Sequence, residues 1–350
     1  MQKSALITGL SLALSGAMLA GIGEWAASGV DSSTAYPASA GTPAASTSGD
    51  VTAAALPAPA IPETPYYVPA STPSYTFRRN VPEVRLQFTV ADEQGRLLPN
   101  LSASDIRVLD DQTPVAHFTD FERDDNLPLR LGLLLDTSDS VKRVLPDEKA
   151  AALEFLNRIL RPQSDNAFVI GFAGTIRVWQ TPTADRSQLI GAINRLQQPG
   201  WGTRFFDALY SACADQLAAH GDKPLVHRAL VVLSDGDDTD SLRNLADVVA
   251  LAQRSEIQIH ALTLRGKKSP SVDRGDQVLI RLTEATGGRL YVAKSSSDLD
   301  RAFSQIEQDL RTQYYVSFTP QSMPGFHSLR VEVRNPQNAE VHARQGYFAQ

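Results

Sequence analysis

The chain has 350 residues, which allows one to three domains. Its 33 Lys and Arg residues against 39 Asp and Glu residues leave a net charge of −6, so it lacks the basic excess that a nucleic-acid-binding protein uses to neutralise phosphates. Hydrophobic residues make up 42% of the chain, enough for a sizeable core. The single cysteine, Cys213, excludes an intramolecular disulfide and a zinc site built from several cysteines.

The first thirty residues predict an export signal. Lys3 is followed by an apolar run that reaches Ile22, and small residues come after it. The alternative is an uncleaved signal anchor, because the run is about long enough to span a bilayer. We therefore expect residues 1–30 to direct export to the periplasm, the cell envelope or the extracellular space. An uncleaved segment would be the protein's only membrane contact.

The next fifty residues have a different composition. Residues 31–80 hold eight prolines among alanine, serine and threonine, with little charge and no periodic apolar pattern. Such a segment buries too little surface to offset the entropy of ordering it, so we predict a disordered linker. Three of its prolines have PxxP spacing, but the basic flank of such ligands is missing, since no Lys or Arg lies between Lys3 and Arg78.

Both ends of the remaining chain have the pattern of short strands. Apolar and polar residues alternate from residue 84 to 90, and the runs 106–109 and 115–121 flank a turn, which predicts a hairpin. Three more short strands are predicted near the C-terminus, at 313–318, 328–333 and within 340–347. Two or three strands need a partner face, so we expect residues 81–126 and 312–350 to form one small, sandwich-like all-β domain.

Between these flanks, residues 127–311 alternate strands with helices. Near-continuous apolar runs, typical of strands covered on both faces, occur at 131–135, 168–172, 229–233 and 257–264. Helical apolar stripes lie between and after them, one of which includes Cys213 and another of which begins at Leu242. This alternation predicts an α/β fold with a doubly wound, mostly parallel sheet, in which Cys213 is a buried, inert thiol.

Oxygen-bearing side chains follow two of the predicted strands. Asp136, Ser138 and Ser140 come at the end of the first, Asp235 follows the strand at 229–233, and Thr203 lies in a glycine-containing loop before a helix. Ligands of such sheets bind outside the carboxyl ends of the strands, where the strand order reverses. If the two strands are neighbours, these five residues form a set of oxygen donors suited to a hard, octahedral cation such as Mg²⁺ or Mn²⁺.

The same five residues resemble the metal-ion-dependent adhesion site (MIDAS) of von Willebrand factor type A domains. That motif is DxSxS, then a distant Thr, then a distant Asp, and the chain matches it in this order across residues 127–311. The β-rich flanks resemble those of a bacterial envelope subfamily of such domains. Asp139 departs from the motif, because glycine is common between the two serines, and its additional carboxylate keeps Ca²⁺ as an alternative cation.

The resemblance implies a function. Ser138, Ser140 and Thr203 would bind the cation directly, and Asp136 and Asp235 directly or through water. Neutral hydroxyl ligands leave the cation with positive charge and one open position, which an Asp or Glu carboxylate of another protein would fill. We therefore expect a cation-dependent protein-binding or adhesion module that is not an enzyme.

Two other interpretations stay open. One is a structural scaffold whose metal site does not function, with partner contacts made by the β-rich domain. The other is a metal-assisted hydrolase, although the chain lacks GxxxxGK, GxSxG and HExxH motifs and has no histidine in the three loops to act as a general base. Asp240 or Ser241 is predicted to cap the helix that follows them, and His260 to be a satisfied core residue.

Overall fold

The structure of the chain is a computed structural model. It describes residues 83–123, 125–197, 200–218, 226–264, 274–320, 324–334 and 338–349. The predicted export signal and linker, residues 1–30 and 31–80, lie outside the described residues.

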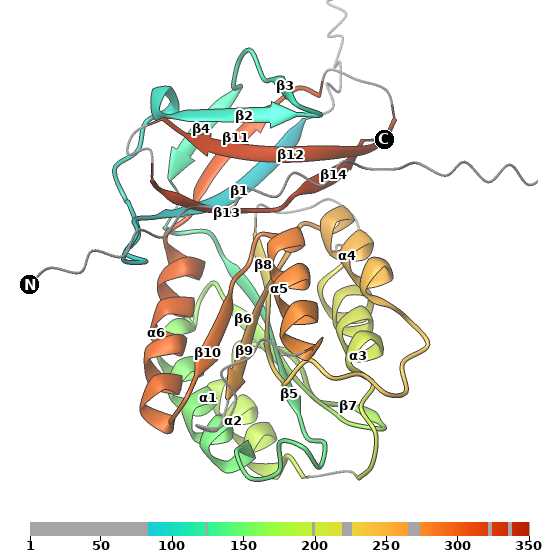
Figure 1. Ribbon diagram of the computed structural model, residues 1–350. Helices are drawn as coiled ribbons and strands as arrows, with labels where there is room; N and C mark the ends of the chain where they lie inside the picture. Colours follow the sequence, from blue (N-terminus) through green and yellow to red (C-terminus); the bar gives the residue numbers. More distant parts are fainter. Residues whose placement is uncertain are drawn as a thin grey trace, which may run out of the picture. The chain divides into compact units, whose positions relative to one another are not determined.

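A six-stranded sheet forms the centre of the α/β part (Figure 1), with the strand order β10-β9-β8-β5-β6-β7. Its strands are β5 (Leu129–Asp136), β6 (Asn166–Phe172), β7 (Ile176–Thr183), β8 (His227–Leu233), β9 (Ile257–Leu264) and β10 (Leu290–Ala293). All neighbouring pairs are parallel except β6 and β7. The mostly parallel sheet predicted from the apolar runs is therefore confirmed. Two strands that were not predicted, β7 and β10, form its edges.

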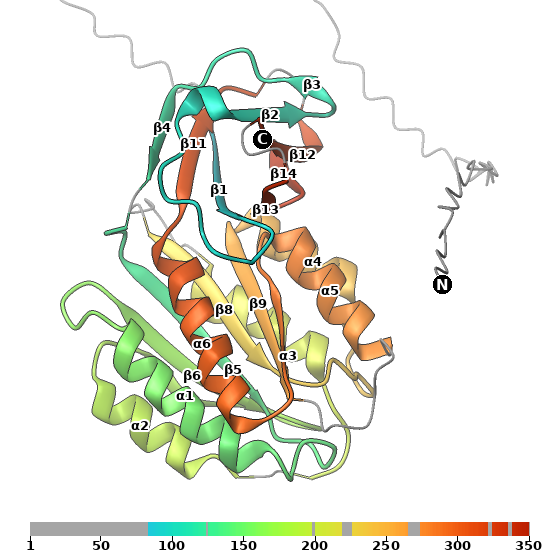
Figure 2. The same cartoon turned by 60° about the vertical axis from the view of Figure 1, so that its left-hand side comes forward.

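Helices cover both faces of this sheet (Figures 1 and 2). One face is covered by α1 (Leu145–Ile159), α2 (Arg186–Arg195) and α6 (Ser296–Arg311). The other is covered by α3 (Phe205–Ser211) with its π-helical continuation Ala212–Leu217, α4 (Leu245–Arg254) and α5 (Arg274–Thr286). Successive strand residues point to opposite faces, so Leu133 packs in the first helical layer and Leu134 in the second. Among the described residues, none of the helices combines the length and apolarity needed to cross a membrane.

The two flanks fold together as two small antiparallel sheets, as predicted. One sheet has the order β13-β1-β11-β4 and the other β14-β12-β2-β3. Their strands are β1 (Val84–Ala91), β2 (Ile106–Asp110), β3 (Thr113–Pro114), β4 (Asp120–Arg123), β11 (Tyr314–Phe318), β12 (Gly325–Val333), β13 (Glu340–Ala343) and β14 (Gly346–Ala349). They share one core, in which Leu86, Phe88 and Val316 of the first sheet meet Val108 and Leu329 of the second.

Two strand predictions in these flanks were wrong in detail. Residues 115–121 do not form the long partner of β2: in this hairpin β2 pairs with the two-residue β3, its long partner is β12, and Phe121 belongs to β4 in the other sheet. Pro114, which has no N–H to donate, stands where that ladder ends. The run 340–347 is not one strand, because β13 pairs with β1 and β14 pairs with β12.

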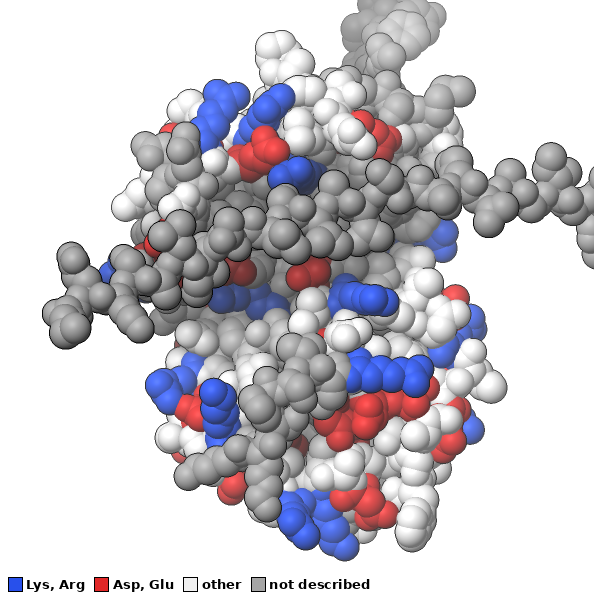
Figure 3. Space-filling view, in the orientation of Figure 1, with Lys and Arg blue, Asp and Glu red and all other residues white. Residues whose placement is uncertain are grey.

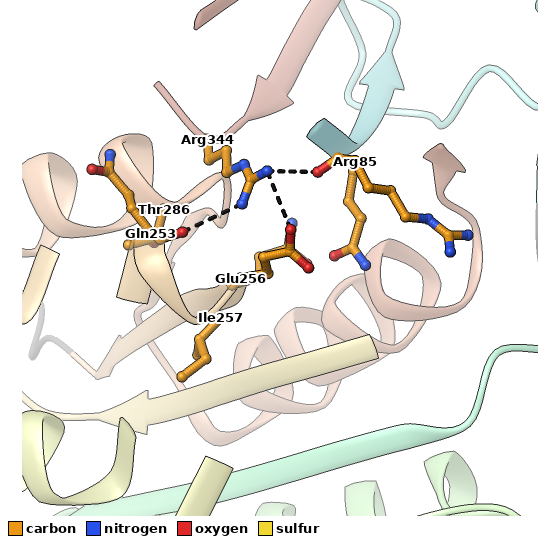
Figure 4. A pocket seen from close by; sticks show the side chains of 8 residues that line it. Arg85, Gln253, Glu256, Ile257, Thr286 and Arg344 are labelled. Carbon is orange, nitrogen blue, oxygen red and sulfur yellow. Dashed lines mark hydrogen bonds and ion pairs between the residues drawn. The ribbon is translucent and has the colours of Figure 1, made fainter. Parts of the chain in front are cut away.

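A buried arginine joins the small sheets to the α/β part (Figure 4). The Arg344 guanidinium donates to the carbonyl of Arg85 (2.6 Å) and to the carbonyl of Gln253 (3.4 Å). It also forms a 3.5 Å ion pair with Glu256. The space left beside these groups is about 20 Å³, close to the room that one water molecule needs. This junction is therefore a packed contact and not a ligand pocket.

Charged side chains of both signs share the face drawn in Figure 3. Lys and Arg side chains alternate there with Asp and Glu over the described part of the surface. The mixed pattern agrees with the net charge of −6. This face therefore lacks, over its described part, the broad basic field that a nucleic-acid backbone would require.

Candidate metal centre

The predicted site residues lie at the carboxyl edge of the central sheet. Strand β5 lies between β6 and β8, so Asp136 at its end is opposite Phe172, and the preceding Leu135 is opposite Leu233. The chain crosses from β5 to β6 in one direction and continues from β8 to β9 in the other, so the strand order reverses between β5 and β8. Asp136, the last residue of β5, and Asp235, just after β8, therefore lie at the ends of two adjacent strands at the switch point, as the predicted site requires.

The Asp136 carboxylate is fully buried at this edge. Its Oδ1 accepts a hydrogen bond from the Ser138 N–H (2.9 Å), and its Oδ2 accepts one from the Ser234 hydroxyl (2.7 Å). Burial raises the pKa of Asp136 to about 6, although the serine hydrogen bonds oppose that rise, and the charge of Asp235 adds to it. Asp136 is thus the buried carboxylate of the candidate site, and the charge of Asp235 acts on it.

Two serine hydroxyls of the loop after β5 point toward each other. Ser138 Oγ and Ser140 Oγ are 3.0 Å apart, with Ser138 buried and Ser140 exposed. Two neutral oxygens at this separation suit adjacent ligands of one cation. Asp139, which lies between them, is exposed to solvent.

Thr203 is held between the loop after β8 and the end of β6. Its carbonyl accepts hydrogen bonds from the N–H groups of Thr239 (2.9 Å) and Asp240 (3.1 Å), and its own N–H donates to the Thr239 hydroxyl (2.8 Å). The next residue, Arg204, donates its N–H to the carbonyl of Ala173 (2.8 Å). Because Ala173 directly follows Phe172, the partner of Asp136, the threonine loop lies at the same edge as both aspartates.

Two glycines just before Thr203 permit this path. Gly200 has φ +118° and Gly202 has φ +82°, in the region that favours glycine. Both glycines therefore hold the loop before Thr203 in a backbone conformation that other residues rarely adopt. Between the two glycines, Trp201 is 89% exposed.

The loop after β8 is organised differently from the sequence prediction. Helix α4 begins after Asn244, whose side chain accepts from the N–H groups of Ala246 and Asp247, so the cap predicted at Asp240 or Ser241 is wrong. Ser241 instead accepts a hydrogen bond from the N–H of Asp207, on α3. The loop extends toward α3 before α4 starts. Leu242, predicted to lie on the apolar stripe of that helix, is accordingly in the loop and 88% exposed.

A further buried carboxyl group, not singled out from the sequence, lies at the start of the helix that follows the loop of Ser138 and Ser140. Glu148 lies in the first turn of α1 and is only 2% exposed. Burial raises its pKa to about 8, and the negative charges of Asp136, Asp235 and Asp147 add to the rise. The sequence does contain a signal, because Glu148 falls on the apolar stripe of Ala152 and Phe155, where a charged residue is unusual.

A second group with metal-ligand chemistry lies in the small sheets. Ligand atoms of Asp110, Asp111 and His327 all lie within 4.8 Å of one another. His327 Nδ1 is 2.7 Å from Asp111 Oδ2, and Asp110 Oδ2 accepts a hydrogen bond from the Tyr347 hydroxyl (3.0 Å). This cluster could not be predicted from sequence spacing, because His327 is more than 200 positions from the aspartates. It belongs to β2, the β2–β3 turn and β12, and is separate from the five predicted ligands.

Cys213 and His260, both predicted to be core residues, are buried in the structure. Cys213 is buried, as predicted, and burial raises the pKa of its thiol to about 12, which disfavours the reactive thiolate. His260 is buried in β9, where burial lowers its pKa well below the usual value. Its Nδ1 accepts a hydrogen bond from the Arg289 N–H (3.3 Å), but its Nε2 has no hydrogen-bond partner among the described residues, so it is only half satisfied.

Comparisons with known proteins agree with this architecture. The sequence profile of the von Willebrand factor type A domain matches residues 131–305. The chain is similar to a UPF0353 protein of Mycolicibacterium paratuberculosis, with 26% identity over 200 residues that cover 51% of this chain and 59% of that protein. A UPF0353 protein of Mycobacterium leprae matches at 24% identity over the same shares. The chain thus spans less than two thirds of the length of these relatives.

Solved structures of low sequence identity resemble the chain. A von Willebrand factor type A structure from Catenulispora acidiphila has 12% identity and a TM-score of 0.44, covering 78% of this chain and 74% of its own. Proximal thread matrix protein 1 from the mussel byssus, solved with a zinc-occupied MIDAS motif, has 13% identity and a TM-score of 0.46. That likeness covers 57% of this chain and 49% of the mussel protein.

Proposed function

Because the chain belongs to the von Willebrand factor type A domain family, whose members are typically metal-dependent protein-interaction modules, we propose that it is a cation-dependent protein-binding module. The role is binding and not catalysis. The partner is a protein that presents an Asp or Glu carboxylate to the site.

The proposed cation ligands are Asp136, Ser138, Ser140, Thr203 and Asp235. All of them offer oxygen, which suits Mg²⁺ or Mn²⁺, with Ca²⁺ as the alternative. When bound, the cation supplies positive charge for a partner carboxylate. The protein's own side chains hold it at the sheet edge, where Asp136 is fixed by Ser138 and Ser234.

The observation that supports this proposal most strongly is the position of Thr203. It is separated by more than sixty residues from Ser140 and by more than thirty from Asp235, yet its backbone is hydrogen-bonded to the loop that carries Asp235. The adjoining Arg204 is bonded to the end of the strand next to Asp136. These backbone bonds hold Thr203 at the edge of the sheet where Asp136 and Asp235 lie.

Exposed apolar side chains on two of these loops support a protein partner. Trp201 precedes Thr203 by two residues and is 89% exposed, and Leu242, on the loop after Asp235, is 88% exposed. Large apolar side chains in solvent are typical of contact surfaces, and tryptophan is enriched at interface hot spots. We therefore propose a partner surface in which apolar groups surround the acidic residue.

We also propose that the module works outside the cytoplasm, in the periplasm, the cell envelope or the extracellular space. This part of the proposal rests on the apolar run after Lys3 and on the proline-rich composition of residues 31–80. Protease accessibility of the protein in intact cells and in spheroplasts would test it. Protection in both would contradict export.

Titration of the full-length protein with Mn²⁺ or Mg²⁺, followed by calorimetry, tests the metal site. We expect the wild type to bind, and Thr203→Ala and Asp235→Ala to stay folded with at least about tenfold weaker affinity. Equal affinities would contradict the ligand assignment. An intact wild type that gives no binding heat would support the scaffold interpretation. Hydrolysis of phosphate or peptide substrates that Asp136→Ala abolishes would support an enzyme.

A further inference from the structure

Glu148 occupies an unusual position for an acidic residue. It lies on the sheet-facing side of α1, together with the buried residues Leu145, Ala152 and Phe155. Only 2% of its surface is exposed, and its Oε2 has no hydrogen-bond partner among the described residues. A buried carboxyl group without a counter-charge or hydrogen bonds destabilises the fold, so its presence here requires a reason.

The first turn of α1 lies at the edge where the proposed ligands meet. The helix begins directly after the DxSxS loop, and the Leu145 N–H donates to the carbonyl of Val141 in that loop (3.0 Å). In the same turn, Asp147 accepts a hydrogen bond from Ser296 at the start of α6 (3.0 Å). Glu148, adjacent to Asp147 but pointing inward, therefore approaches the site from the interior.

The electrostatic surroundings of Glu148 are negative. The charges that act on it are those of Asp136, Asp235 and the neighbouring Asp147. Asp136 and Glu148, which are both buried, repel each other and Asp235 unless protons or a cation neutralise these carboxyl groups. A divalent cation at the proposed site would provide that neutralisation and would account for the unpartnered Oε2.

We propose that Glu148 supplies a third carboxylate to the cation, from the inner side of the site. This inference rests on the proposed function and extends its ligand set beyond the five motif residues. More carboxylates strengthen the binding of a hard cation, as the charge count of calcium sites shows. They also reduce the charge that remains for the partner, so Glu148 strengthens cation retention and weakens attraction of the partner carboxylate.

The test compares Glu148→Gln with Glu154→Gln by Mn²⁺ calorimetry on the full-length protein at one pH. Both changes remove one carboxylate from α1, but Glu154 is exposed and serves as the matched control. We expect Glu148→Gln to lower the Mn²⁺ affinity by about tenfold or more, and Glu154→Gln to leave it within about twofold. The thermal midpoint of the cation-free Glu148→Gln protein should equal or exceed that of the wild type.

Wild-type Mn²⁺ affinity in folded Glu148→Gln would overturn the inference while leaving the proposed function intact. A purely structural Glu148 would give that result, with a change only in the thermal midpoint. If the wild type itself binds no Mn²⁺, both the inference and the proposed metal site fail. Should Glu148→Gln not fold, Glu148→Asp replaces it, because its side chain is shorter by one methylene and the same loss of affinity is expected.

Discussion

The Asp238 carboxylate accepts hydrogen bonds from the backbone N–H groups of Phe205 (2.9 Å) and Phe206 (3.3 Å), the first two residues of α3. A residue of the loop after β8 thus caps the helix that follows Thr203. The contact is reciprocal, because Asp207 of α3 accepts from the N–H of Arg243 (2.9 Å). These bonds fix the loop of Asp235 and the loop of Thr203 to each other.

We expect Asp238→Ala to lower the free energy of unfolding by about 1 kcal/mol, the usual effect of losing a helix cap. Because the bond also aligns two ligand loops, the Mn²⁺ affinity should fall as well. Urea unfolding and calorimetry measure the two effects. Asp238→Asn is the matched variant. Its side-chain carbonyl still accepts hydrogen bonds, so this variant should retain most of the free energy of unfolding and most of the Mn²⁺ affinity. Unchanged Mn²⁺ affinity in Asp238→Ala would show that the cap does not align the site.

The backbone at Gly236, next to Asp235, has φ +82°, and a Cβ there would lie 2.5 Å from the carbonyl oxygen of Gly275 and 2.8 Å from Leu279. We expect Gly236→Ala to destabilise the fold by about 2–3 kcal/mol, because it combines backbone strain with overpacking against α5. Gly200→Ala is the control: Gly200 also has positive φ, but no described atom lies within 4 Å of its Cβ.

The control should therefore lose only about 1 kcal/mol, from strain alone. Displacement of the Asp235 loop should weaken Mn²⁺ binding in Gly236→Ala more than in Gly200→Ala. Urea unfolding curves and Mn²⁺ titrations of both variants provide the comparison. Equal stabilities would mean that the contact with α5 relaxes at no cost.

Without a divalent cation, the stability of the fold should decrease as pH rises from about 5 to 8. Burial, with the neighbouring carboxylates, raises the pKa of Asp136 to about 6 and that of Glu148 to about 8. In this range the folded state retains protons that the unfolded chain has already released, so raising the pH favours unfolding. We expect the thermal midpoint in a chelator to be lower by about 5 °C at pH 8 than at pH 5.5.

Glu148→Gln should remove a large part of this pH dependence, since glutamine does not titrate. Scanning calorimetry of both proteins in the chelator gives the comparison. Buried His227, whose pKa burial lowers to about 4, acts in the opposite direction, because its stability contribution is lost as pH falls from about 6.5 toward 4. The difference between the two proteins therefore isolates Glu148. A thermal midpoint that rises with pH to the same extent in the wild type and in Glu148→Gln would contradict the expected loss of stability at high pH.

The sheet and the gathering of the ligand loops were predictable, because both follow from local rules. Continuous apolar runs indicate strands covered on both faces, and parallel strands present their carboxyl ends at one edge, so Asp136 and Asp235 had to lie on the same side. Strand β10 (Leu290–Ala293) escaped prediction because it has only four residues. Strand β7 escaped because its side chains are all partly or fully exposed, as expected at a sheet edge.

The parts of the candidate site that could not be predicted depend on contacts between distant segments. Asp238 caps a helix more than thirty positions earlier in the chain, whereas a sequence pattern suggests only the helix that follows. Glu148 interrupts an apolar stripe, but its relation to Asp136 and Asp235 becomes visible only when α1 packs on the sheet. Leu242 fitted a helical spacing, and the bonds between its loop and α3 overrode that local preference.

Strand β1 lies between β11 and β13, antiparallel to both, and it is the first strand of the described chain. A mechanical load applied to the chain before Val84 would therefore act along β1 and be shared by hydrogen bonds on its two sides. The carboxyl-edge loops lie at the end of the central sheet away from its junction with β4 and β11. Tension from the N-terminal side would therefore first be resisted by the backbone ladders of the small sheets on both sides of β1, at a distance from the loops that carry Asp136, Thr203 and Asp235.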